Sequence, residues 1–156
     1  MTLDKIRKFI LQKSPKSGQE ILDFIDKVEI LHFNNRTHYC KNGKLHREDG
    51  PAVEWVDGTK YWYLNGKYHR TDGPAVEYAN GSKEWWLNGK CHRKDGPAVE
   101  YANGANMWYI NGKLHRTDGP AIEYANGIKF WYLNGILQTI EEKDVRNYTM
   151  DWIRSH

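Results

Sequence analysis

Short apolar-rich runs in the middle of the chain come in pairs, and each pair is separated by Asp-Gly or Asn-Gly. In one example, residues 74–79 form the first run, Asn80-Gly81 follows, and residues 82–87 form the second. Asn-Gly between two strand-forming runs is a strong hairpin signal, because a type I′ turn requires positive φ at both central residues. The pattern therefore predicts a β-hairpin over residues 74–87.

This hairpin pattern recurs with a period of 23 residues and without insertions. A degenerate partial copy precedes the full copies, with Tyr39 aligned to Trp62 and residues 42–44 aligned to residues 65–67. A degenerate terminal copy is typical of the end of a repeat array. The predicted organisation is an N-terminal segment 1–28, a repeat array 29–137 with a partial repeat 29–44 and full repeats 45–67, 68–90, 91–113 and 114–136, and a C-terminal segment 138–156.

A two-residue turn at Asn80-Gly81 would decide which side chains share a face of the hairpin. It places Val76 opposite Trp85, and the more apolar face is then assigned to the core. That face carries Val76, Tyr78, Lys83, Trp85 and Leu87. The opposite face carries Ala75, Glu77, Ala79, Ser82, Glu84 and Trp86. A bulge at the turn would exchange the two faces.

Each hairpin adds two strands at a spacing of ~4.8 Å, so successive repeats should advance by roughly 10 Å. Placed side by side, the repeats predict a mainly β fold, an elongated single-layer antiparallel sheet. A sheet of this kind has little depth and needs large flat side chains to fill it. This accounts for an aromatic content of 13%.

The two ends of the chain have a different pattern. Residues 3–13 place apolar side chains at helical spacing, and residues 14–16 break that pattern. Capping-box spacing follows at residues 17–20 and occurs again at residues 139–142. We therefore expect two helices before the repeats and one after them, capping the exposed edges of the sheet. The alternative is that one helix docks a partner or a second copy of the chain.

The turn phrases resemble those of a known repeat family. The period of 23 residues, the phrase Asn-Gly-Lys-x-His and the phrase Tyr-Ala-Asn-Gly are similar to the MORN repeat over residues 28–137. The usual glycine of the opening motif is missing from residues 61–64, and His-Gly-x-Gly is replaced by His-Arg-x-Asp-Gly-Pro. This style resembles the repeat proteins of bacteriophages and giant viruses. The resemblance implies an elongated sheet that binds proteins or lipids and has no catalytic residues.

Charge and composition narrow the class of partner. The net charge is +3 with no basic run, and acidic side chains recur on the same sheet, which disfavours nucleic acid. The two cysteines are too few for a disulfide framework. The N-terminus lacks a secretory signal, and no stretch approaches the ~20 apolar residues of a membrane span. These features predict a cytoplasmic protein, located in the host cytoplasm if it is phage-encoded.

The most conspicuous motif is His-Arg-x-Asp-Gly-Pro-Ala, which begins at His46, His69, His92 and His115. In one interpretation its arginines form a row of anion-binding loops for phosphate or partner carboxylates. In the other, the aspartate caps the turn, while His and Arg bond to the backbone or to a nearby Glu54 or Glu77. Because the motif is present in every full repeat, we favour the structural interpretation.

Catalysis and metal binding are not expected. Equivalent histidines should lie roughly 10 Å apart, too far to share a zinc ion whose ligands lie at ~2.0–2.1 Å. Cys91 is aligned with Leu45, Tyr68 and Leu114, a column that indicates a buried apolar position rather than a nucleophile. An active site is normally singular, so the repeats predict no enzyme, no metal and no cofactor.

A row of large aromatics on the second face offers a binding surface. Beside it runs a variable column, formed by Tyr61, Glu84, Met107 and Phe130. This face is either open to a partner or covered by the linkers and the terminal helices. We predict a non-catalytic protein that docks a protein partner through this face and through the arginine loops. The expected contact residues are Tyr63, Trp86, Tyr109, Tyr132, Arg47, Arg70, Arg93, Arg116, His69 and His92.

Two alternatives belong to other functional classes. One is a phage or viral counter-defence factor that inhibits a host immune protein or sequesters a small anionic ligand, such as a signalling nucleotide. The other is a structural module that assembles with copies of itself.

Overall fold

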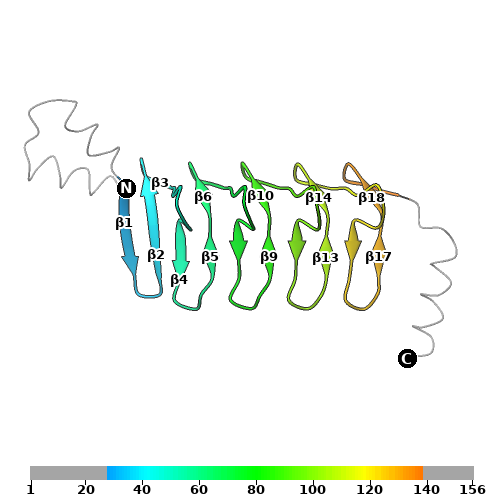
Figure 1. Cartoon of the computed structure of the whole chain (residues 1–156), viewed down its shortest axis with the longest axis horizontal. Coiled ribbons are helices and arrows are strands. Elements are labelled where there is room, and N and C mark those ends of the chain that lie inside the picture. The colour runs from blue at the N-terminus through cyan, green and yellow to red at the C-terminus, as the bar shows by residue number, and fades with distance from the viewer. Residues whose placement is uncertain (1–27, 139–156) are drawn as a thin grey trace, which may run out of the picture. The chain divides into compact units, whose positions relative to one another are not determined.

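Short β-strands joined by tight turns make up residues 28–138, the part of the chain that this computed structural model describes. No helix occurs among these residues, and the described protein is mainly β, as predicted (Figure 1). The predicted terminal helices lie outside the described residues. The chain divides into two units, residues 1–90 and 91–156, with the division falling inside β11 (Lys90–Cys91).

In the first unit, consecutive hairpins lie side by side in an antiparallel sheet with the strand order β1-β2-β4-β5-β8-β9. A short strand, β3, pairs with β2, and β6 pairs with β7 as a separate two-stranded hairpin. The strands of this unit are β1 (Val28–Phe33), β2 (Arg36–Lys41), β3 (Lys44–Leu45), β4 (Val53–Trp55), β5 (Lys60–Tyr61), β6 (Tyr63–Leu64), β7 (Lys67–Tyr68), β8 (Val76–Glu77), β9 (Lys83–Glu84) and β10 (Trp86–Leu87).

The second unit repeats this arrangement. Its sheet has the order β12-β13-β16-β17, and β14–β15 and β18–β19 form two-stranded hairpins. The strands are β12 (Val99–Glu100), β13 (Asn106–Met107), β14 (Tyr109–Ile110), β15 (Lys113–Leu114), β16 (Ile122–Glu123), β17 (Lys129–Phe130), β18 (Tyr132–Leu133) and β19 (Ile136–Leu137). Tandem antiparallel hairpins at the predicted spacing are therefore present in both units.

The turn at Asn80-Gly81 differs from the prediction. Strands β8 and β9 pair Val76 with Glu84 and Glu77 with Lys83, which is one residue away from the predicted pairing. Of the two turn residues, Gly81 has positive φ, at 90°, and Asn80 does not. The Gly81 N–H donates to the Tyr78 carbonyl at 2.9 Å, and the Tyr78 N–H donates to the Ser82 carbonyl at 2.9 Å. The connection is thus a three-residue loop closed by a glycine bulge, not a two-residue type I′ turn.

The type I′ turn occurs at the other Asn-Gly of each repeat. Asn65 and Gly66 both have positive φ, at 52° and 77°, and they pair Leu64 with Lys67 across a two-residue loop. The predicted second strand is therefore interrupted at Trp62, where β5 ends and β6 begins a second hairpin. In Figure 1, β6 lies beyond one end of β5, and the turn that joins β4 to β5 lies at the other end. Each full repeat carries two hairpins rather than one.

The altered pairing turns the second strand over relative to the first, since a slip of one residue moves every side chain of a strand to the other face, and Val76 now shares its face with Glu84 instead of Lys83. Val76 is buried, as predicted, but Tyr78 is 37% exposed and Lys83 is exposed. Ala75 was placed on the opposite face and is fully buried. The core assignment was therefore wrong at these positions. The core includes an alanine followed by a β-branched residue in each full repeat, Ala52 and Val53, Ala75 and Val76, Ala98 and Val99, and Ala121 and Ile122, together with Cys40, Cys91 and Ala105.

The degenerate first repeat keeps the contacts of a full repeat where its sequence permits. Tyr39 accepts the His46 N–H at 2.9 Å through its carbonyl, as Trp62 accepts the His69 N–H at 3.1 Å. Asn42 has φ of 53°, like its counterparts in the full repeats. The predicted alignment of Tyr39 with Trp62 is confirmed by these equivalent bonds.

Candidate functional site

The arginine of each His-Arg loop is held by groups of its own repeat. In the second repeat, Arg70 Nε donates to Asp72 Oδ1 at 3.0 Å. Its Nη1 donates to the Pro74 carbonyl at 3.1 Å and to Glu77 Oε1 at 2.9 Å. The guanidinium carbon lies 4.1 Å from the centre of the Trp62 ring, within cation–π range. The arginine therefore fastens the loop to the strand that follows it and to the repeat before it.

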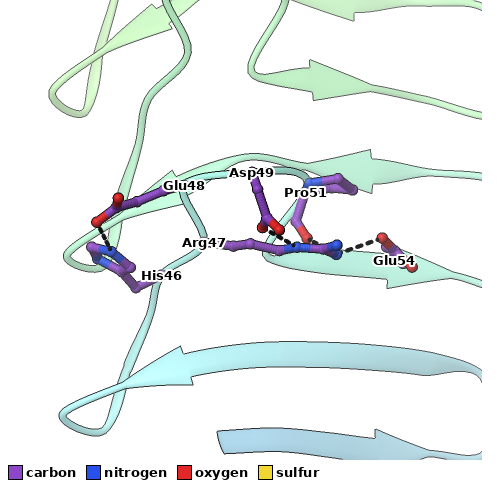
Figure 2. A network of polar contacts seen from close by, with 6 residues as sticks. All are labelled: His46, Arg47, Glu48, Asp49, Pro51 and Glu54. Carbon is purple, nitrogen blue, oxygen red and sulfur yellow. Dashed lines mark hydrogen bonds and ion pairs between the residues drawn. The ribbon is translucent and has the colours of Figure 1, made fainter. Parts of the chain in front are cut away.

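Figure 2 shows the same arrangement around Arg47, whose guanidinium points at Asp49, Pro51 and Glu54. Its three hydrogen bonds measure 2.9, 3.2 and 2.9 Å. In the second unit, Arg93 and Arg116 make the corresponding bonds, and Arg93 Nη1 donates to Glu100 at 2.7 Å. These side chains are 22–24% exposed, so most of each arginine lies within the protein.

The glycine of each loop makes room for the guanidinium. A Cβ on Gly73 would lie 2.9 Å from Arg70 Cζ, closer than real Cβ contacts allow. The corresponding distance in the fourth repeat, from Gly119 to Arg116, is also 2.9 Å. A larger residue at this position would have to displace the guanidinium from its hydrogen bonds.

The histidine of each loop accepts a hydrogen bond from the type I′ turn of the same repeat. The Asn65 N–H donates to His46 Nδ1 at 3.1 Å, and the Asn88 N–H donates to His69 Nδ1 at 3.2 Å. The same bond measures 3.1 Å for His92 and for His115. His46 Nε2 also lies 3.3 Å from Glu48 (Figure 2). The histidines therefore brace the second hairpin, which supports the structural interpretation of the motif.

Three of the loop aspartates, Asp49, Asp72 and Asp118, have a pKa below the ordinary value. The hydrogen bond from Arg70 lowers the pKa of Asp72, and Arg47 and Arg116 lower the pKa of Asp49 and Asp118 in the same way. Because the carboxylates are charged and bonded, each arginine already has anionic partners inside its own loop.

A different set of side chains gathers on the other face of the first unit. We call Tyr61, Tyr68, Tyr78, Glu84 and Trp86 the Glu84 cluster. The Tyr61 ring makes edge contacts with Tyr68 and with Tyr78, at centroid distances of 6.0 and 6.1 Å. Tyr68 lies 5.5 Å from Trp86. The contacts therefore form a chain from Tyr78 through Tyr61 and Tyr68 to Trp86.

Glu84 closes this chain into a ring of contacts. The Tyr78 hydroxyl donates to Glu84 Oε1 at 3.1 Å, and the Trp86 indole N–H donates to Glu84 Oε2 at 2.8 Å. Val76 is paired across the sheet with both Tyr61 and Glu84 and is only 1% exposed. Directly paired residues project from the same face, so Val76 lies at the base of the ring.

The Glu84 cluster is made largely of residues that depart from the repeat. Three of its members stand at variable positions of the repeat. One repeat later, the position of Tyr61 is occupied by Glu84, that of Tyr68 by Cys91 and that of Glu84 by Met107. Trp86 stands where the other full repeats have tyrosine. A side chain present in every repeat builds the scaffold, whereas these singular residues converge on one surface.

Burial and neighbouring charge raise the pKa of two tyrosines of the cluster, Tyr61 and Tyr78. Tyr61 and Tyr78 both titrate above their ordinary range, mainly because they are partly desolvated, and the Glu84 carboxylate contributes in both cases. Tyr63 stacks on Tyr68 at a centroid distance of 4.3 Å. Desolvation and a hydrogen bond with Tyr68 raise the pKa of Tyr63. The hydroxyls of Tyr61, Tyr63 and Tyr78 are therefore protonated at neutral pH, and that of Tyr78 donates to Glu84.

The predicted contact residues fall into three groups in the structure. Trp86 belongs to the Glu84 cluster, and Tyr63 stacks on Tyr68 of the same cluster. Tyr109 and Tyr132 are half-buried in the second unit. The arginines and histidines occupy the loop networks. The contact residues predicted from the sequence do not include Tyr68, Tyr78 or Glu84. Tyr68 and Glu84 differ from the residues at the equivalent positions of the neighbouring repeats, and this difference was the available signal.

Comparisons with known protein families and with curated proteins found no match for this chain. The structure supports a β-hairpin repeat protein, and the resemblance to MORN repeats stays a prediction. Among the described residues, none forms a helix able to cross a bilayer. Within the same part of the chain, no three His, Cys, Asp or Glu side chains group as metal ligands would.

Proposed function

We propose that this chain is a non-catalytic binding protein of divergent MORN type, which docks a protein partner through the Glu84 cluster. The observation that carries the proposal is that four residues that differ from their counterparts in the next repeat, Tyr61, Tyr68, Glu84 and Trp86, converge in this cluster. Clustered Tyr and Trp side chains are enriched where proteins make their strongest contacts. Tyr78 is 37% exposed, so the cluster reaches the surface of the described structure.

The loop arginines act as scaffold in this proposal. Their Nε and Nη1 donors are occupied by carboxylates and a carbonyl of the same repeat, as the Arg70 bonds show. A partner carboxylate that approached Nε or Nη1 would have to displace one of these groups. The contact residues carried over from the sequence are therefore Trp86 and Tyr63, with the remainder of the Glu84 cluster added to them.

Affinity capture with the full chain tests the proposal. The loss variant combines Glu84→Met with Trp86→Tyr, because the third repeat carries these residue types at the equivalent positions. The substituted repeat should fold, since its scaffold already accommodates them. A matched control combines Met107→Phe with Tyr109→Trp, using residue types that other repeats carry in the same two columns.

We expect a protein from a native host lysate that is retained by the wild type and the control but lost with the loss variant. Quantitative mass spectrometry of the three samples measures this difference. Equal retention by the loss variant and the control, or no protein retained by the wild type, would contradict the proposal.

A further inference from the structure

Glu84 is a half-buried carboxylate whose partners are neutral. It accepts hydrogen bonds from Tyr78 and Trp86, at 3.1 and 2.8 Å. Among the described residues it makes no ion pair, whereas the carboxylates Glu54, Glu77, Glu100 and Glu123 each pair with a loop arginine. A partly desolvated charge gains from an opposite charge nearby. Glu84 therefore has an unmet preference for a cation.

The lysines nearest in the sheet are directed to the opposite face. Lys60 and Lys83 are both paired across the sheet with Glu77, and directly paired residues share a face. Glu77 bonds to Arg70, which places that face with the arginine networks. Within the cluster itself the charge is that of Glu84, and Asp57 adds to the electrostatic effect on Tyr61. The cation Arg36 projects from the same face, but it lies over the Trp55 ring on β2, four strands away from Glu84 on β9.

The aromatic members of the cluster suit the same kind of ligand. Tyr61 stands nearly perpendicular to Tyr68 and to Tyr78, with interplanar angles of 89° and 76°. Perpendicular rings present faces in different directions around a common base, which here is Val76. The faces of Tyr and Trp rings attract cations through their quadrupole, most strongly beside a carboxylate that adds its own charge.

We propose that the Glu84 cluster receives a basic side chain, lysine or arginine, of the partner protein. This inference rests on the proposed function and specifies the chemistry of the partner at this surface. The cation lies against the rings of Tyr61, Tyr78 and Trp86 and is neutralised by Glu84. A norleucine side chain, which has the shape of lysine without its charge, gains only apolar contact and binds more weakly.

A titration of the full chain followed by NMR tests this directly. The probes are three blocked tripeptides, glycine-X-glycine with lysine, norleucine or glutamate at X. The reporter is the Trp86 indole N–H, assigned by its disappearance in Trp86→Tyr. We expect a saturable shift with the lysine peptide and little or none with the other two. Glu84→Gln should weaken lysine-peptide binding by about tenfold, a loss of both the charge and its share of the cation–π attraction.

The matched control is Glu48→Gln, which removes an equivalent charge at a side chain that is 78% exposed and outside the cluster. Lysine-peptide affinity should be unchanged in this variant. The proposal is wrong if the norleucine peptide shifts the Trp86 indole as strongly as the lysine peptide, or if Glu84→Gln binds with wild-type affinity.

The two proposals can fail separately. If a captured partner is lost from the variant with Glu84→Met and Trp86→Tyr, yet Glu84→Gln retains it and the lysine peptide causes no shift, the surface binds a protein but not through a cation. If the wild type captures no protein while the lysine peptide binds, the cluster is a cation site and the proposed function is wrong.

Discussion

At the residue scale, Asn80 and Asn88 show how one dipeptide can produce two turns. Both asparagines precede glycine, but only Asn88 has positive φ, at 52°. The Asn80 side chain instead accepts the Ser82 N–H at 2.9 Å, which holds a turn with positive φ at the glycine alone. The Ala79 N–H adds a bond of 3.1 Å to Thr59 in the preceding repeat. The Asn80 bond has a counterpart in every full repeat, at Asp57, Asn103 and Asn126, so it is the contact that accompanies the three-residue loop.

The left-handed conformation of Asn88 leads to a prediction at this scale. Asn88→Ala should lower the free energy of unfolding by about 1 kcal/mol, because the alanine Cβ is strained in this region. Asn88→Gly should cost less, since glycine adopts positive φ without that strain. Urea unfolding of the two variants measures the difference. Equal destabilisation would show that the asparagine side chain, not the backbone, stabilises the turn.

At the scale of the element, the His-Arg loop joins one hairpin to the next. The loop has little regular structure of its own, so its side chains supply the bonds that strands would otherwise make. Arg70 contacts Asp72 and Glu77 and lies over Trp62 of the preceding repeat. Because the arginine spans these groups, its removal should loosen the loop as a whole.

A double-mutant cycle between Arg70 and Gly73 tests this account. Gly73→Ala alone should destabilise the protein by about 2 kcal/mol, because its Cβ would lie 2.9 Å from Arg70 Cζ and must displace the guanidinium. In an Arg70→Ala background the same change should cost much less, since the colliding group is gone. The measurement is the free energy of unfolding of the four proteins in urea. Additive costs would mean that Gly73 is needed for another reason.

The lowered pKa of Asp72 predicts how this loop responds to acid. A carboxylate whose pKa is depressed on folding contributes stability above its unfolded pKa, about 3.9, and that stability is lost as the pH falls through the folded value. Unfolding free energy should therefore decrease below about pH 4. Asp72→Asn should make this decrease shallower, while Asp49 and Asp118 maintain the rest. An unchanged acid profile in Asp72→Asn would contradict the assignment.

At the scale of the whole molecule, a uniform scaffold carries a single surface of unusual residues. Every full repeat has the arginine network, but the Glu84 cluster occurs in the first unit only among the described residues. The scaffold positions in the second unit are equivalent, since Met107 pairs with Ile122 and Ile122 pairs with Phe130 as Tyr61, Val76 and Glu84 do. The scaffold and the surface can therefore be varied independently.

Transplanting the cluster tests this separation. The substitutions Met107→Tyr, Leu114→Tyr, Phe130→Glu and Tyr132→Trp reproduce it around Tyr124, which already contacts Phe130 edge-on at 6.2 Å. We expect the grafted chain to bind two lysine peptides where the wild type binds one, with the added indole resonance shifting on titration. A folded graft with unchanged stoichiometry would show that the five side chains are insufficient for cation binding.

The sequence alone determined the repeat length, the positions of the turns and the antiparallel, mainly β fold, because Asn-Gly and Gly-Pro act locally on the backbone. It also indicated that the His-Arg loops are structural, since they are present in every full repeat. The tertiary structure decided which Asn-Gly forms the two-residue turn. In every full repeat the asparagine N–H of that turn donates to a histidine 19 residues earlier, a contact that is distant in the sequence. A slip of one residue exchanges the faces of a strand, so only the structure could bring Tyr78 together with Glu84.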